Sequence, residues 1–230
     1  MKQTVCVIAA HPDDEVLGCG GTLAKHVIQG DSVHVFIAAE GVTARDAIRD
    51  IHRRQHELTE LKNSAYKANE CLGVQSVTFG NFPDNRMDSM ERLVIIKSIE
   101  EYLKPLNPTI IYTHHSSDIN IDHQRVHEAV ITACRALPHS HLKRLLFFEV
   151  LSNTEWQVSG SQKFFHPNWY VDISQTLEKK LHALRAYYSE LCDWPHPRSI
   201  RGVEALAAWR GCSVGVDAAE AFVLGRYIDS

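Results

Sequence analysis

The stretch VCVIAAHPDDE, residues 5–15, is the most informative part of the chain. Its apolar first half is typical of a buried strand, and one imidazole and three carboxylates follow at once. In an open parallel α/β sheet, ligands bind at the carboxyl ends of the strands, where this polar run is expected to emerge. His11 and Asp14 are three residues apart and can bind one Zn²⁺ ion together, which leaves Asp13 free to handle protons.

Strand-like and helical patterns alternate along the first two thirds of the chain. Strands are predicted at residues 4–10, 32–39, 77–80, 109–114 and 144–150, and helices at residues 18–29, 44–72, 90–103 and 122–137. This order predicts an α/β fold with a Rossmann-like, doubly wound, mostly parallel sheet and right-handed crossovers.

The last third has a different pattern, with a short strand expected at residues 169–173 and helices at 174–191 and 200–209. Since no low-complexity linker precedes it, we expect a single domain over residues 1–230. A Rossmann-like core of residues 1–150 is then followed by a C-terminal α+β elaboration, residues 151–230.

The composition excludes several classes of partner. The formal net charge is −4, so no basic field favours nucleic acid or an anionic membrane surface. The six cysteines form no CxxC pair and are typical of reduced thiols. With no apolar run near about 20 residues and no signal-peptide pattern at the N-terminus, we expect a cytoplasmic protein. The pattern leaves homo-oligomerisation open.

A second polar cluster, HHSSDINIDH at residues 114–123, also follows a predicted strand. From there His123 can meet His11 and Asp14, and two histidines with one carboxylate and an open fourth position form a catalytic zinc set. The plainer interpretation of the first cluster is a helix N-terminus whose acidic residues complement the macrodipole, but it gives no role to His11. The His123/His127 pair is not a zincin motif, because residue 124 is glutamine.

Together the two clusters resemble the PIG-L/LmbE-like family of zinc-dependent sugar N-deacetylases. The family's opening signature AHPDDE is matched at residues 10–15, and its second motif, HPDH or NxDH, corresponds to NIDH at residues 120–123. The resemblance implies that His11, Asp14 and His123 are the metal ligands and that Asp13 is the general base. It implies Zn²⁺ as the cofactor, with another divalent transition metal as the alternative, and a small N-acetylated sugar as the substrate.

Asn120 departs from the HPDH form of the second motif, whose first histidine helps to polarise the scissile carbonyl. The Asn120 amide can still donate a hydrogen bond to an oxyanion, but it has no positive charge. Either the zinc does more here, or His114, His115 or Arg198 assists. Asp122 is expected to orient Asn120 or a neighbouring histidine.

The resemblance also suggests residues that contact the substrate. FPDNR at residues 82–86 is similar to the family's LPDG segment, whose aspartate meets substrate hydroxyls, which implies this role for Asp84. Arg45 follows the second predicted strand, where family members often have a substrate-contacting arginine, and Arg53 and Arg54 compete with it for that role. Arg198 lies in a polar segment and is a candidate to contact an anionic group.

These observations predict a zinc-dependent hydrolase that removes the N-acetyl group from an N-acetylglucosamine-like amino sugar. Two alternatives stay open: a zinc amidase acting on a non-sugar or thiol-conjugate amide, and a non-catalytic relative that binds metal or sugar. The identity of the sugar depends on residues 151–166 and 193–201. Trp156, Trp169, Trp194 and Trp209 are expected to be mostly buried or at interfaces, with one or two available to stack on a sugar ring.

Overall fold

The computed structural model describes residues 2–138, 140–158 and 164–229. In these ranges the chain forms a seven-stranded sheet with the order β3-β2-β1-β4-β5-β7-β6. The strands are β1 (Thr4–Ala9), β2 (Ser32–Ala39), β3 (Ser76–Phe82), β4 (Ile110–His114), β5 (Arg144–Phe148), β6 (Trp169–Asp172) and β7 (Ala219–Tyr227).

The first five strands are parallel, as the alternating pattern predicts. β1 lies at the centre and pairs with β2 on one side and β4 on the other. The strand order reverses between β1 and β4, and in a doubly wound sheet the crevice at this switch point is the usual place for a ligand. The two polar clusters of the sequence follow these two strands.

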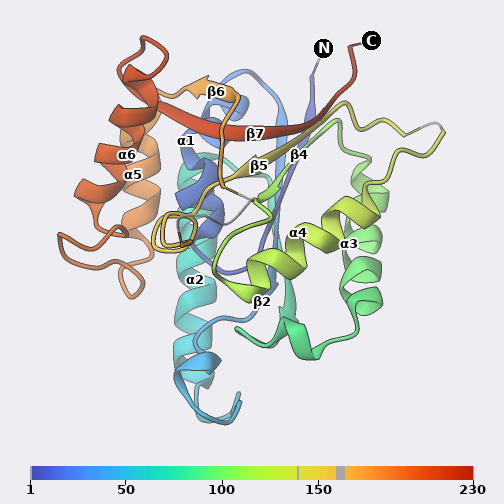
Figure 1. The fold of residues 1–230 in the computed structure, drawn as a ribbon. Coiled ribbons are helices and arrows are strands. Elements are labelled where there is room, and N and C mark those ends of the chain that lie inside the picture. Colours follow the sequence, from blue (N-terminus) through green and yellow to red (C-terminus); the bar gives the residue numbers. More distant parts are fainter. Residues whose placement is uncertain (1, 139, 159–163, 230) are drawn as a thin grey trace.

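Helices cover both faces of the sheet (Figure 1). One face is packed by α1, α2, α5 and α6, and the other by α3 and α4. The helices are α1 (Asp14–Ile28), α2 (Gln55–Leu72), α3 (Arg92–Leu106), α4 (Ile121–Ala133), α5 (Leu177–Arg185) and α6 (Ile200–Cys212). Two short 3-10 helices, η1 (Thr43–Arg45) and η2 (Met87–Ser89), lie in the connections. The expected doubly wound α/β fold is confirmed.

Several element boundaries differ from the prediction. The expected helix 44–72 is wrong in its first third, because η1 and turns precede α2. Residues 46–54 are mostly exposed, Ile48 included, so this segment has no apolar stripe to bury. α1 begins at Asp14 rather than at residue 18, while α4 and α5 are shorter than predicted. Gly73 ends α2 in a left-handed conformation, as expected of a glycine in that place.

The sequence pattern did not predict β7. This strand inserts antiparallel between β5 and β6, so the C-terminal region extends the main sheet. Its segment AEAFVLGRY contains a buried glutamate, Glu220, and a glycine, which interrupt the pattern of a buried strand.

The buried Glu220 side chain binds backbone N–H groups at a point where α1 departs from helical geometry. The backbone of α1 leaves helical geometry at Cys19 (φ −150°, ψ 18°). The Glu220 carboxylate accepts hydrogen bonds from the N–H groups of Gly21 (3.0 Å) and Thr22 (2.7 Å). Lys180 of α5 donates both to Glu220 (2.6 Å) and to the Leu17 carbonyl (2.8 Å) on the other side of the break. The C-terminal region thus satisfies the backbone groups that the break would leave unpaired.

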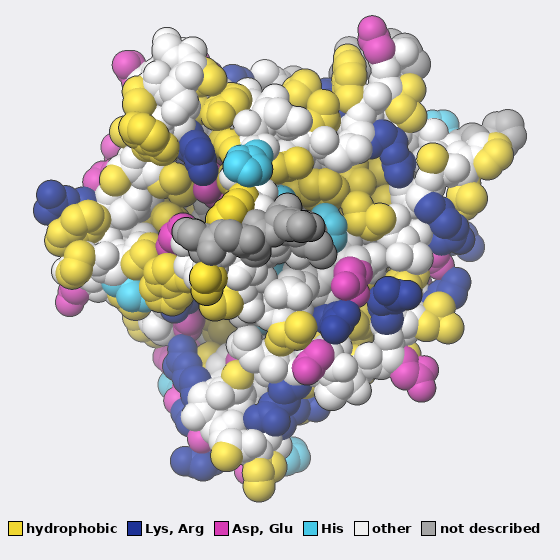
Figure 2. All heavy atoms as spheres, in the orientation of Figure 1, with side chains coloured by type: hydrophobic (Ala, Val, Ile, Leu, Met, Phe, Trp, Pro, Cys, Tyr) yellow, Lys and Arg dark blue, Asp and Glu magenta, His cyan; other side chains and the backbone are white. Residues whose placement is uncertain are grey.

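In the described part of the chain, no helix combines the length and apolar character needed to cross a bilayer. On the face drawn in Figure 2, Lys and Arg side chains are interspersed with Asp and Glu. This mixture agrees with the small net charge of the sequence.

Candidate metal centre

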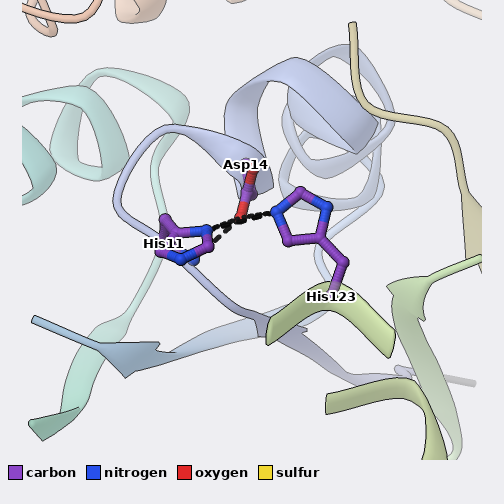
Figure 3. A group of neighbouring side chains, drawn as sticks. All are labelled: His11, Asp14 and His123. Carbon is purple, nitrogen blue, oxygen red and sulfur yellow. Dashed lines mark hydrogen bonds and ion pairs between the residues drawn. The ribbon is translucent and has the colours of Figure 1, made fainter. Parts of the chain in front are cut away.

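His11, Asp14 and His123 converge at the switch point between β1 and β4 (Figure 3). His11 follows β1, Asp14 is the first residue of α1, and His123 lies in the first turn of α4. The Asp14 Oδ2 atom is 3.3 Å from His11 Nδ1 and 3.2 Å from His123 Nε2, and the two imidazole nitrogens are 3.2 Å apart. The three donor atoms form a nearly equilateral triangle.

This triangle fits a divalent metal ion. A tetrahedral Zn²⁺ with bonds of about 2.0–2.2 Å keeps its ligand atoms about 3.3–3.6 Å apart, and the three separations found here lie near the short end of that range. Burial alone would raise the pKa of Asp14, but His123, His114 and a hydrogen bond from His11 hold that pKa well below its usual range. Burial lowers the pKa of His123, but Asp14 and Asp118 outweigh it and raise that pKa to about 9. The centre of the triangle therefore favours positive charge, which a divalent cation supplies.

A second carboxylate lies behind each histidine. Asp122 Oδ2 is 3.0 Å from His11 Nε2, and Asp118 Oδ2 is 2.9 Å from His123 Nδ1. Both carboxylates are themselves fixed, since Asp122 accepts the N–H groups of Asn85 and Met87, and Asp118 accepts the N–H of Asn120. Such a partner fixes the orientation and tautomer of a metal-binding imidazole.

Asp13 lies beside the ligands in a strained backbone conformation, with φ 117° and ψ −28°. Its N–H donates to Glu15 Oε2 at 3.1 Å, and Glu15 Oε1 accepts from Asn69 of α2 and from the Tyr187 hydroxyl. Burial raises the pKa of Glu15 to about 7, against the opposing hydrogen bonds from Tyr187 and Asn69. A non-glycine residue at positive φ persists only where its surroundings enforce it, and the hydrogen bond to Glu15 is one contact that holds Asp13 in this conformation.

The pKa of the Asp13 carboxyl is raised well above its usual range, first by burial and then by the charge of Asp14. The Arg198 guanidinium acts in the opposite direction, with its Nη1 3.6 Å from Asp13 Oδ2. A carboxyl with a raised pKa can both accept and return a proton near neutral pH.

A cleft of about 360 Å³ opens over the triangle of His11, Asp14 and His123. Nine of the residues singled out from the sequence line it: His11, Asp13, Asp14, His123, Arg45, Asp84, Asn120, Trp156 and Arg198. Arg45 pairs with Glu190 at 2.9 Å. Asp84 accepts the Ala44 N–H and the Asn85 amide, so its carboxylate is already engaged.

Other candidates lie outside the cleft. Asp122 is fully buried, with its carboxylate against His11. Arg53 and Arg54 pair with Asp46, which leaves Arg45 as the arginine of these three that reaches the cleft.

Two of the proposed helpers of Asn120 are buried histidines. His114 is fully buried and stacks on His123 with ring centroids 3.9 Å apart, and its Nε2 accepts the Ala10 N–H. Burial lowers the pKa of His114 well below its usual value, and burial and the charge of His127 lower that of His115 to about 4. Both rings are therefore neutral near pH 7, whereas the guanidinium of Arg198 lines the cleft.

Several residues around the site were not found from the sequence. Asn69 and Tyr187 contact Glu15, Asp118 contacts His123, and Ser152, Asn153 and Glu190 line the cleft. Of these, Asp118 could have been found from the sequence, because it lies within the polar cluster at residues 114–123. The others lie far along the chain from the two motifs.

The chain is similar to known deacetylases. A family model, PIG-L, described as GlcNAc-PI de-N-acetylase, matches residues 6–134, which include all three residues of the triangle. The uncharacterized deacetylase YaiS of Escherichia coli is 28% identical over 142 residues, 60% of this chain and 71% of that protein. A probable N-acetyl-α-D-glucosaminyl L-malate deacetylase 2 of Bacillus cereus is 24% identical over 192 residues, 83% of this chain and 84% of that protein.

The fold is also found among solved structures. The N,N'-diacetylchitobiose deacetylase from Pyrococcus horikoshii superposes with a TM-score of 0.77 at 22% identity, covering 97% of this chain and 84% of that one. This similarity extends through the C-terminal region, beyond the segment that the family model matches. The chain therefore belongs to the PIG-L family of de-N-acetylases.

Proposed function

We propose that this N-deacetylase removes the acetyl group from an N-acetylglucosamine-like amino sugar, with a divalent metal ion, Zn²⁺, bound by His11, Asp14 and His123. The proposal rests on one observation above all. The three donor atoms have the mutual spacing of tetrahedral zinc ligands, and Asp13 lines the same cleft. The names of the relatives support an amino-sugar substrate, because one is a probable N-acetylglucosaminyl malate deacetylase and another structure is a diacetylchitobiose deacetylase.

A metal ion bound at this triangle would polarise the amide carbonyl and lower the pKa of water. Asp13 accepts a proton from the attacking water and returns it to the departing amine, a double role that its raised pKa suits. Glu15 holds the Asp13 backbone in place during both transfers. The products are acetate and a free amino sugar.

The negative charge that develops on the carbonyl oxygen needs donors from the protein. Asn120 caps α4 through its Oδ1 and donates one amide N–H to Asn85, so its second N–H is available to the oxyanion. His114 and His115 are neutral near pH 7, and His115 does not line the cleft. Arg198 is therefore the helper that we propose supplies positive charge.

Acetate release from N-acetylated sugars tests the proposal. Purified protein is assayed as isolated, after chelation and after Zn²⁺ is restored, with N-acetylglucosamine, its simple glycosides and simple N-alkylacetamides as substrates. We expect release from the sugars that is lost on chelation and returns with zinc. Release from the simple amides alone would favour the amidase alternative, and release that survives complete metal removal would contradict the proposed centre.

A further inference from the structure

Trp156 is a large aromatic side chain that the protein leaves half exposed beside its metal centre. Its relative exposure is 51%, and it lines the same cleft as His11, Asp14 and His123. The edge of its ring meets the ring of His196 at nearly a right angle (85°), with centroids 5.6 Å apart. Two segments far apart in the sequence thus meet at the rim of the cleft and present one indole to it.

The backbone around Trp156 is held on both sides. Thr154 donates to Asp118 Oδ2 at 2.9 Å and accepts the Val150 N–H at 2.8 Å, and Gln157 donates to the Ser117 carbonyl at 3.0 Å. Asp118 is also the carboxylate behind the ligand His123. The indole and the metal centre are therefore positioned by the same buried group, as a binding surface requires.

Neither arginine of the cleft is available to an anionic substituent of the substrate. Arg45 pairs with Glu190 at 2.9 Å, and Arg198 lies 3.6 Å from Asp13 and serves the reacting carbonyl in the proposed mechanism. Asp84 adds a carboxylate to the lining, while the charge of Asp14 would be balanced by the metal ion. Among the described residues, the cleft contains no arginine or lysine free of a carboxylate partner that would receive a phosphate.

From these observations we propose that Trp156 is a specificity-determining residue that stacks on the apolar face of an uncharged pyranose ring. The substrate class is then a neutral N-acetylglucosaminyl glycoside rather than a sugar phosphate or nucleotide sugar. This inference rests on the proposed deacetylase function and names the class of sugar that the same site takes. The C–H face of a pyranose is apolar while its hydroxyls stay hydrated at the edge, which suits a half-exposed indole.

Kinetics of Trp156→Ala and Trp156→Phe with a neutral and an anionic substrate test the proposal. The neutral substrate is N,N'-diacetylchitobiose and the anionic one is N-acetylglucosamine 1-phosphate. We expect the wild-type protein to prefer the neutral substrate at least tenfold in kcat/KM. We expect Trp156→Ala to raise KM for that substrate about tenfold while kcat changes less than about twofold, and Trp156→Phe to keep most of the affinity. Trp209→Ala is the matched control, because Trp209 is 64% exposed on α6 and does not line the cleft.

Binding measured without turnover separates this inference from the proposed function. Metal-free protein is titrated with N,N'-diacetylchitobiose, which is uncharged, and tryptophan fluorescence is followed. A fluorescence change that occurs in the wild type and in Trp209→Phe but not in Trp156→Phe supports stacking of the sugar on Trp156, even where no acetate is released. The inference is overturned if Trp156→Phe keeps the full fluorescence change, if Trp156→Ala keeps the wild-type KM, or if the 1-phosphate is the better substrate.

Discussion

The backbone N–H of Asp13 donates a 3.1 Å hydrogen bond to the side chain of Glu15, two residues further along the chain. This bond turns the strained Asp13 toward the cleft, and Asn69 and Tyr187 fix Glu15 in turn. The third acidic residue of the HPDDE run thus supports the first. We assign Glu15 a positioning role.

Glu15→Gln should therefore impair turnover without removing the metal ligands. A glutamine has one acceptor oxygen where Glu15 uses two, so either Asp13 or the Asn69–Tyr187 pair loses its partner. We expect kcat to fall by about tenfold to a hundredfold with metal content unchanged. Tyr187→Phe removes one donor and should have a smaller effect. Wild-type kcat in Glu15→Gln would show that Asp13 keeps its position without this bond.

Substitutions of Asp13 and His123 should distinguish a loss of proton transfer from a loss of metal binding. Asp13→Asn removes the group that accepts the proton but leaves the triangle intact, so we expect stoichiometric metal and a loss of kcat of about 10²–10⁴. His123→Ala removes one corner of the triangle and should lose both metal and activity. Metal content by mass spectrometry and acetate release, measured on the same samples, check both. Near-wild-type turnover by Asp13→Asn would refute its assignment as the base.

The buried pair of Lys180 and Glu220 should matter for stability. Lys180→Met leaves the Glu220 charge buried without its partner and removes the donor to Leu17. We expect a loss of about 3–5 kcal/mol in the free energy of unfolding, measured by denaturant titration. Lys97→Met is the control, because Lys97 forms an exposed pair with Glu100 and should change stability by less than about 1 kcal/mol. Equal effects of the two substitutions would contradict the role of Lys180 and Glu220 in stabilising α1.

His115 should give the protein a measurable sensitivity to acid. Burial and the charge of His127 lower its pKa to about 4 in the folded protein, against about 6.5 when unfolded. Because the folded state binds the proton less readily, this stability is fully present above pH 6.5 and is lost as the pH falls toward 4. Between pH 7.5 and pH 5 the wild type should lose about 2 kcal/mol more than His115→Asn.

Unfolding titrations of metal-free protein at both pH values check this expectation. His56→Asn is the control, since His56 has a side chain 84% exposed and should leave the pH dependence unchanged. Parallel pH dependence in the wild type and His115→Asn would contradict it.

The three residues of the triangle could be brought together from the sequence because their signal is local. His11 and Asp14 lie in one short run after a buried strand, and His123 follows the strand that pairs with β1. The doubly wound topology then brings the two strand ends together without further information. The fold class follows from the same alternation of strands and helices.

The supporting residues could not be predicted because their contacts are distant and their types are ordinary. Tyr187 is 172 positions from Glu15, and Glu220 is 198 positions from Thr22. A glutamate or lysine in sequence is expected at the surface, and only the tertiary structure shows that Glu220 and Lys180 are buried together. The same limit applies to the helix predicted at 44–72. Its polar sequence runs on without interruption, and only the structure shows that residues 46–54 do not pack against the core.

The break in α1 has a consequence for how this protein could be divided. The segment that the family model matches ends at residue 134. The helix that begins with Asp14 nevertheless depends on hydrogen bonds from the side chains of Lys180 and Glu220. A shortened chain that kept every motif would still leave two amide groups of that helix without acceptors. The shortest segment that identifies the family is therefore not the shortest that can hold Asp14 in place, and a minimal version of this protein must extend through β7.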